Sequence, residues 1–74
     1  MSERIRRMKS SDVEQILRRH GFQLVSQQDS HRKWRHPGRW LQVIVPEHAG
    51  RELPLGTLRT IFVNAEIPES EWKS

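Results

Sequence analysis

Two segments, one near each end of the chain, carry hydrophobic residues at helical spacing. In the first, the positions i, i+3, i+4 and i+7 that share one helix face are Val13, Ile16, Leu17 and His20. Ser11 is predicted to cap the start of this helix and to form a capping box with Glu14. Gly21 fits the left-handed position that ends a helix, with Phe22 folding back on Leu17. The sequence therefore predicts a short amphipathic helix that ends just before Gly21.

Three strands are predicted between the two helical segments, over residues 22–27, 31–36 and 40–46. Asp29-Ser30 and Pro37-Gly38 are typical turn pairs, so the strands should form an antiparallel meander. The middle strand alternates, and its faces carry Arg32, Trp34 and His36 on one side and His31, Lys33 and Arg35 on the other. The apolar face of the third strand is formed by Leu41, Val43 and Val45.

The second helical segment begins near Pro54 or Leu55. Its apolar residues again fall at i, i+3, i+4 and i+7, namely Leu58, Ile61, Phe62 and Ala65. Residues 67–72 are predicted to add a last helical turn that packs Trp72 against the body of the protein.

The predicted order is α-β-β-β-α, an α+β fold in which a three-stranded antiparallel sheet carries two helices on one face. This order and size are similar to those of the double-stranded-RNA-binding domain. Residues 9–74 are expected to form one domain, preceded by a flexible basic arm over residues 1–8. Trp34, Val43 and Val45 should face the helices, which leaves His31, Lys33 and Arg35 on the open face of the sheet.

Composition narrows the possible functions of this fold. The 74 residues include no cysteine, so thiolate metal sites and disulfides are excluded. The net charge is +4, and residues 1–39 hold ten Lys and Arg against four Asp and Glu, which favours a polyanionic partner. No apolar run approaches the roughly 18 residues of a membrane span, and no secretion signal is evident, so a cytoplasmic location without membrane contact is expected.

Three stretches of the chain are similar to the HicA toxin family, the small ribonucleases of HicA–HicB toxin–antitoxin pairs. They are MKSSDVEQILRRHGFQLV (residues 8–25), SHRKWRHP (30–37) and VIVPEHAGRELPLGTLRTIF (43–62). The ordered set, which lies within residues 8–67, carries the resemblance. It implies a ribonuclease that cuts messenger RNA and halts translation, and a HicB-like antitoxin that covers the active face. It also implies that His31 is the catalytic residue.

The residue types around His31 suit cleavage of RNA without a metal or other cofactor. RNA supplies its own nucleophile, the 2′-hydroxyl group, and histidine suits the proton transfers because its reference pKa is about 6.5. Lysine and arginine stabilise charge on the phosphate. RNA contacts are expected from Lys33, Arg35, Ser30, Arg32, Arg18 and Arg19.

Asp29 leaves two alternatives open, because it stands where the HicA family usually has glycine. Aspartate tolerates a left-handed backbone better than most residues, so the turn can survive. Its carboxylate, however, repels phosphate. The chain would then be a non-catalytic RNA-binding module. A separate alternative is a protein-interaction subunit whose basic face binds only an acidic partner.

The other histidines and the tryptophans have less specific interpretations. His36 and His48 are structural or RNA-contacting, and His20 suits a helix C-terminus. A zinc site of His31, His36 and His48 is disfavoured by their spacing. Trp34 is predicted to lie in the core, whereas Trp40 is the better candidate for stacking on a base.

Overall fold

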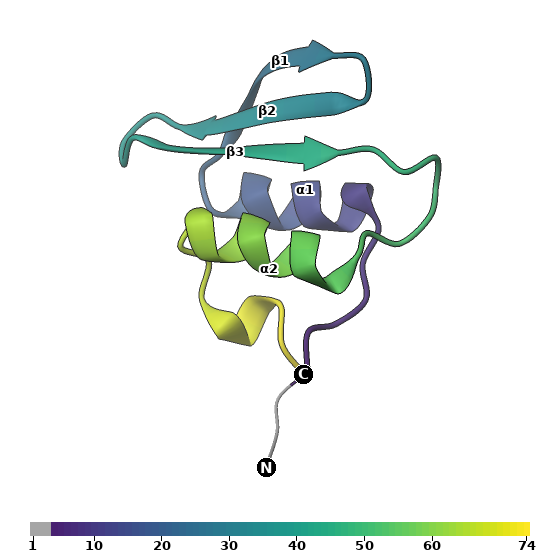
Figure 1. Ribbon diagram of the computed structural model, residues 1–74. Helices are drawn as coiled ribbons and strands as arrows, with labels where there is room; N and C mark the ends of the chain where they lie inside the picture. The colour runs from purple at the N-terminus through teal and green to yellow at the C-terminus, as the bar shows by residue number, and fades with distance from the viewer. Residues whose placement is uncertain (1–3) are drawn as a thin grey trace.

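The computed structural model describes residues 4–74, which form a three-stranded sheet with both helices on one of its faces (Figure 1). The elements in chain order are α1 (Ser10–Arg19), β1 (Gln23–Gln28), β2 (His31–His36), β3 (Leu41–Pro46), α2 (Leu55–Asn64) and the 3-10 helix η1 (Glu69–Glu71). The predicted α-β-β-β-α fold is confirmed. Within residues 4–74, no helix has the length and apolar character needed to cross a membrane.

The sheet is an antiparallel meander in the order β1-β2-β3, so β2 is its central strand. His31 pairs with Pro46 and His36 pairs with Leu41, which places His31 and His36 at opposite ends of the sheet. A bulge shifts the register between Leu24 and Ser26 of β1. All six residues of β1 are exposed, whereas β2 and β3 contribute buried side chains to the core.

The core lies between the sheet and the two helices, as the alternation of polar and apolar residues predicts. Trp34 is 1% exposed and Val45 is fully buried, both on the helix side of the sheet. The helices contribute the buried residues Val13, Ile16, Leu17, Leu58, Ile61 and Phe62. Trp72 stacks on Phe62 with 5.4 Å between ring centroids, which confirms its predicted packing on the body.

The end of α1 follows the prediction, whereas its start does not. The main-chain N–H of Phe22 donates to the carbonyl of Leu17 at 3.0 Å, and Gly21 has a φ of 91°. At the other end, α1 begins one residue before the predicted cap Ser11. The Asp12 carboxylate accepts the main-chain N–H of Lys9 at 3.0 Å, which performs the capping role assigned to Glu14. Glu14 is instead buried and faces the sheet, where it accepts hydrogen bonds from Arg32 and Trp34 of β2.

The segment before α1 is docked against the end of the chain rather than extended into solvent. Ile5 forms a bridge with Lys73, and the Arg6 N–H donates to the Trp72 carbonyl at 3.0 Å. Met8 is 4% exposed. The predicted flexible arm over residues 1–8 therefore needs correction over residues 4–8, because Ile5 and Met8 supply apolar anchors among the arginines. Residues 1–3 of that arm lie outside the described residues.

The turn between β2 and β3 also departs from prediction at one residue. Trp40 is predicted to begin a strand, but β3 begins at Leu41 and Trp40 belongs to the turn. Its N–H donates to the His36 carbonyl at 3.0 Å, its φ is 59°, and it is 87% exposed. The turn therefore extends beyond Pro37-Gly38 to Trp40, whose left-handed backbone leads the chain into β3.

Candidate functional site

The open face of β2 presents three basic or titratable side chains in a row. His31, Lys33 and Arg35 alternate with the inward-facing residues of the strand, so consecutive members are spaced about 7 Å apart. Among residues 4–74, no side-chain hydrogen bond or ion pair engages any of the three. The three strands contain no aspartate or glutamate. This face of the sheet is therefore cationic and chemically available, as the sequence predicts.

A groove follows the edge strand β3, with His31 of β2 on one side and helix α2 on the other. Its volume is about 530 Å³. Its lining residues come from both layers and from the loop before α2, namely His31, Ile44, Pro46, Pro54, Gly56, Thr57, Thr60 and Ile61. The groove places one imidazole beside two hydroxyl groups and an apolar wall.

The helix residues of this groove are not identifiable from local sequence patterns. A glycine near the start of a helix indicates only a tolerable loss of helix propensity at Gly56, and nothing local assigns a role to Thr57 or Thr60. Each lies on α2, far from His31 in the sequence, and only the packing of α2 beside the edge strand β3 brings them together. The stretch Gly56-Thr57-Leu58-Arg59 belongs to the resemblance to the HicA family, and it is the one available signal.

The turn before His31 accommodates aspartate in the position where the family pattern has glycine. Asp29 has a φ of 55°, in the left-handed region that aspartate tolerates better than most residues. The Ser30 carbonyl accepts the Glu47 N–H at 2.8 Å, which ties the turn to the end of β3. The prediction that the turn survives with Asp29 is thus confirmed. Ser30 lies in this turn directly before His31.

Arg32 lies on the opposite side of β2, where two carboxylates engage it. Its guanidinium donates to Glu14 at 2.8 Å and to Glu47 at 3.3 Å. The second oxygen of Glu14 accepts the indole N–H of Trp34 at 2.9 Å. Arg32, which the sequence predicts to contact RNA, therefore lies in a different environment from Lys33 and Arg35. It helps to join β2 to α1.

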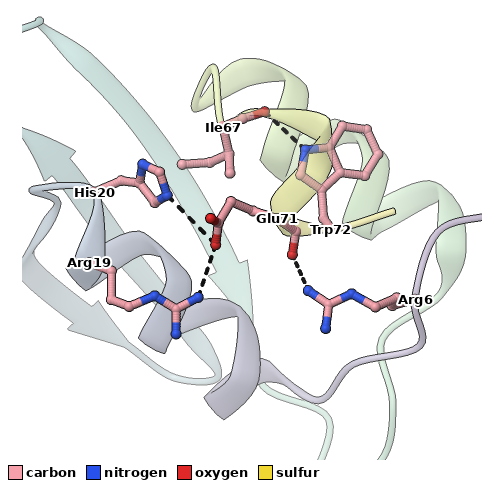
Figure 2. A network of polar contacts seen from close by, with 6 residues as sticks. All are labelled: Arg6, Arg19, His20, Ile67, Glu71 and Trp72. Carbon is pink, nitrogen blue, oxygen red and sulfur yellow. Dashed lines mark hydrogen bonds and ion pairs between the residues drawn. The ribbon is translucent and has the colours of Figure 1, made fainter. Parts of the chain in front are cut away.

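Arg18 and Arg19, the other predicted RNA contacts, also engage protein groups. The Arg18 guanidinium lies 5.1 Å from the centroid of the Trp34 ring, within range of a cation–π interaction. Figure 2 shows Arg19 and His20, both from the end of α1, directed at the Glu71 carboxylate of η1, with Arg19 at 3.0 Å and His20 at 3.8 Å. Arg6 reaches the main-chain carbonyl of Glu71 in the same network.

The remaining histidines lie away from the groove. His36 accepts the Gly38 N–H through Nδ1 at 3.1 Å and meets Phe22 edge-on, so it supports the turn after β2. His20 joins the network of Glu71, and His48 is exposed in the loop after β3. Across the described part of the chain, no three His, Asp or Glu side chains are grouped as a metal site requires.

Comparison with known protein families gives a match over most of this chain. The family model described as the HicA toxin of bacterial toxin-antitoxin matches residues 10–67, which include both helices, the whole sheet and every residue of the groove. No curated protein matches the chain.

Proposed function

Because the chain belongs to the HicA toxin family, the toxin side of a toxin–antitoxin pair, we propose that it is a metal-independent endoribonuclease. Its substrate is messenger RNA, and cleavage inhibits translation. His31 acts as general acid–base, while Lys33 and Arg35 bind phosphate. The observation that supports this most directly is the position of His31, which lines a groove at the edge of a cationic sheet face.

The proposed reaction is a transesterification within the RNA. The 2′-oxygen bonds to phosphorus, the bond from phosphorus to the 5′-oxygen breaks, and a 2′,3′-cyclic phosphate remains. A neutral His31 takes the proton from the 2′-hydroxyl, and water protonates the departing 5′-oxygen. Arg35 suits bidentate contact with phosphate oxygens, and Lys33 adds a second positive charge one alternation closer to His31.

Two substitutions of histidine separate catalysis from folding. Purified protein, incubated with RNA in EDTA, is expected to cleave it, and His31→Ala is expected to lose about 10²–10⁴-fold in rate. The matched control is His20→Asn, which removes a histidine on the other side of the molecule and leaves a residue that suits a helix end. Equal cleavage by the parent and His31→Ala would refute the role of His31. Dependence of cleavage on added metal would refute the metal-free mechanism.

The family membership implies an antitoxin partner, and we propose a HicB-like protein that covers the open sheet face. Induction of the chain alone should arrest growth, while co-expression with the antitoxin or the His31→Ala change should relieve the arrest. Arrest that persists with His31→Ala would show that toxicity does not depend on the proposed chemistry.

A second candidate function rests on one observation, the Asp29 carboxylate two residues before His31. In this alternative the chain binds RNA without cleaving it, because the carboxylate repels the scissile phosphate. Asp29→Gly then distinguishes the two functions. A chain that cleaves only after this change is a binding module in its present form, whereas a chain that already cleaves is an active toxin.

A further inference from the structure

A second groove lies beyond the first, on the far side of Gly56. Its volume is about 500 Å³, and its lining residues are Arg4, Ile5, Arg7, Leu55, Gly56 and Arg59. Three arginines from two distant segments thus line one hollow, with no carboxylate among the described lining residues. No ion pair within residues 4–74 involves any of the three. We call this hollow the arginine groove.

The arginine groove exists because the segment before α1 is docked. The Ser74 N–H donates to the Arg4 carbonyl at 2.9 Å, and the Leu53 N–H donates to the Met8 carbonyl at 2.9 Å. These main-chain bonds hold the segment beside the start of α2 while leaving the side chains of Arg4 and Arg7 to line the groove. Arg6, between them, is directed instead to the carbonyl of Glu71.

Gly56 lines both the arginine groove and the groove of His31. A Cβ atom built on Gly56 meets no atom within 4 Å, so the space beside the residue that the two hollows share is open. A third hollow, lined by Gln42, Val43, Asn64 and the residues Ile44, Thr60 and Ile61 that it shares with the groove of His31, continues along α2 in the other direction. The three hollows follow α2, with His31 in the middle one.

We propose that the arginine groove binds the backbone phosphates of the RNA strand on one side of the cleavage site. This inference rests on the proposed function, since it extends the same substrate past His31. Guanidinium groups bind phosphate oxygens in a bidentate manner, and a cationic groove that continues from a reaction site follows a strand without reading its sequence. Because the two grooves share Gly56, a strand bound at His31 would extend directly into the arginine groove, which favours RNA over an acidic protein.

Binding is best measured in the His31→Ala background, where the RNA stays intact. Two single-stranded RNAs are compared, one of about 4 and one of about 12 nucleotides, a short and a long length within the range of about 4–16 nucleotides that single-strand grooves bind. Replacing Arg4, Arg7 and Arg59 together by glutamine is expected to weaken binding of the longer RNA about 10–100-fold at low salt. The salt dependence should become shallower by about 0.7 in log–log slope for each phosphate that the variant no longer neutralises. The short RNA should bind almost equally to both proteins.

Two further variants separate the proposal from general charge effects. Arg39→Gln removes one positive charge at the opposite end of the sheet and should leave the length dependence unchanged. Gly56→Leu fills the junction without changing charge and should weaken binding of the longer RNA. Circular dichroism and melting of each variant establish that it is folded.

The possible outcomes test RNA binding by the arginine groove separately from the proposed ribonuclease activity. Equal weakening of both RNAs would overturn the proposal, as would a triple variant that binds RNA normally but loses affinity for an acidic antitoxin. If the parent fails to cleave RNA, the catalytic function fails, yet a length-dependent loss of binding still supports the arginine groove as an RNA track.

Discussion

The two faces of β2 use the same residue types for opposite purposes. On the inner face, Arg32 is held by Glu14 and Glu47, and Trp34 donates to Glu14. On the outer face, His31 and Lys33 have no such partner within the described residues. One strand therefore carries a cation that stabilises the fold and, one position away, a cation that is available to a ligand.

The difference comes from the distribution of carboxylates rather than from the strand itself. On the inner face, α1 supplies Glu14 and the residue after β3 supplies Glu47. The three strands themselves contain no acidic residue, so the outer face has none. Positive charge on a small protein therefore identifies a binding surface only after the partners of each cation are known. Substitutions on the two faces should separate stability from function.

The largest effect is expected from Glu14→Ala on the inner face. Glu14 is 5% exposed and binds both Arg32 and Trp34, so its loss leaves the buried indole N–H without its acceptor and the partly buried guanidinium with Glu47 alone. Breaking such a pair costs about 3–5 kcal/mol of unfolding free energy. Urea unfolding measures the loss, and an unfolding free energy within about 1 kcal/mol of the parent would contradict the structural role of this pair.

Trp34→Phe tests the same face with a smaller change. A smaller aromatic ring stays in the core, but the hydrogen bond from the indole to the Glu14 carboxylate is lost, which should cost about 1.5–3 kcal/mol. Thermal unfolding measures the loss. Cleavage per folded molecule should remain close to that of the parent, and a selective loss of cleavage would mean that the two faces are coupled.

Lys33→Ala and Arg35→Ala test the outer face. Both side chains lack partners in the described structure, so the unfolding free energy should change by less than about 0.5 kcal/mol. Each should weaken RNA binding about tenfold at low salt and reduce the salt slope by about 0.7. Salt titrations with fluorescent RNA make the measurement. Loss of stability without loss of RNA binding would mean that the outer-face cations stabilise the fold rather than bind a ligand.

Asp29→Gly should give the smallest effect, and a gain. The change removes an exposed carboxylate two residues before His31. A unit charge about 4 Å from a bound phosphate in water contributes about 1 kcal/mol, which corresponds to roughly fivefold in cleavage rate. It also relieves the left-handed backbone at φ 55°. Single-turnover cleavage and thermal melting report the two contributions separately. A slower reaction in the glycine variant would show that Asp29 assists His31.

The fold could be predicted from the sequence because each element has a local signal. The Gly21-Phe22 helix end, the alternation around Trp34 and the helical spacing from Leu58 to Ala65 are all properties of neighbouring residues. The predicted start of α1 is wrong because Asp12 and Glu14 both offer a carboxylate near Ser11, and only tertiary packing draws Glu14 into the core.

The site could be predicted only in part, for the same reason. His31, Lys33 and Arg35 share a face because strand alternation is local. The engagement of Arg32 by Glu14 and Glu47, and the meeting of Gly56 with His31, depend on contacts between segments 15 or more residues apart. The docking of Ile5 on Lys73 joins the two ends of the described chain, which no local pattern signals.

The Gly21 that ends α1 sets a limit on how the sequence can vary. A Cβ atom there would lie 2.7 Å from Nε2 of His36, besides requiring a left-handed backbone at φ 91°. Relaxing the backbone alone would not accommodate a larger residue, and neither would trimming His36 alone. A larger residue at position 21 is therefore disfavoured for two independent reasons, the contact with His36 and the left-handed backbone. A compensating change would have to alter both the end of α1 and the hairpin that carries His36.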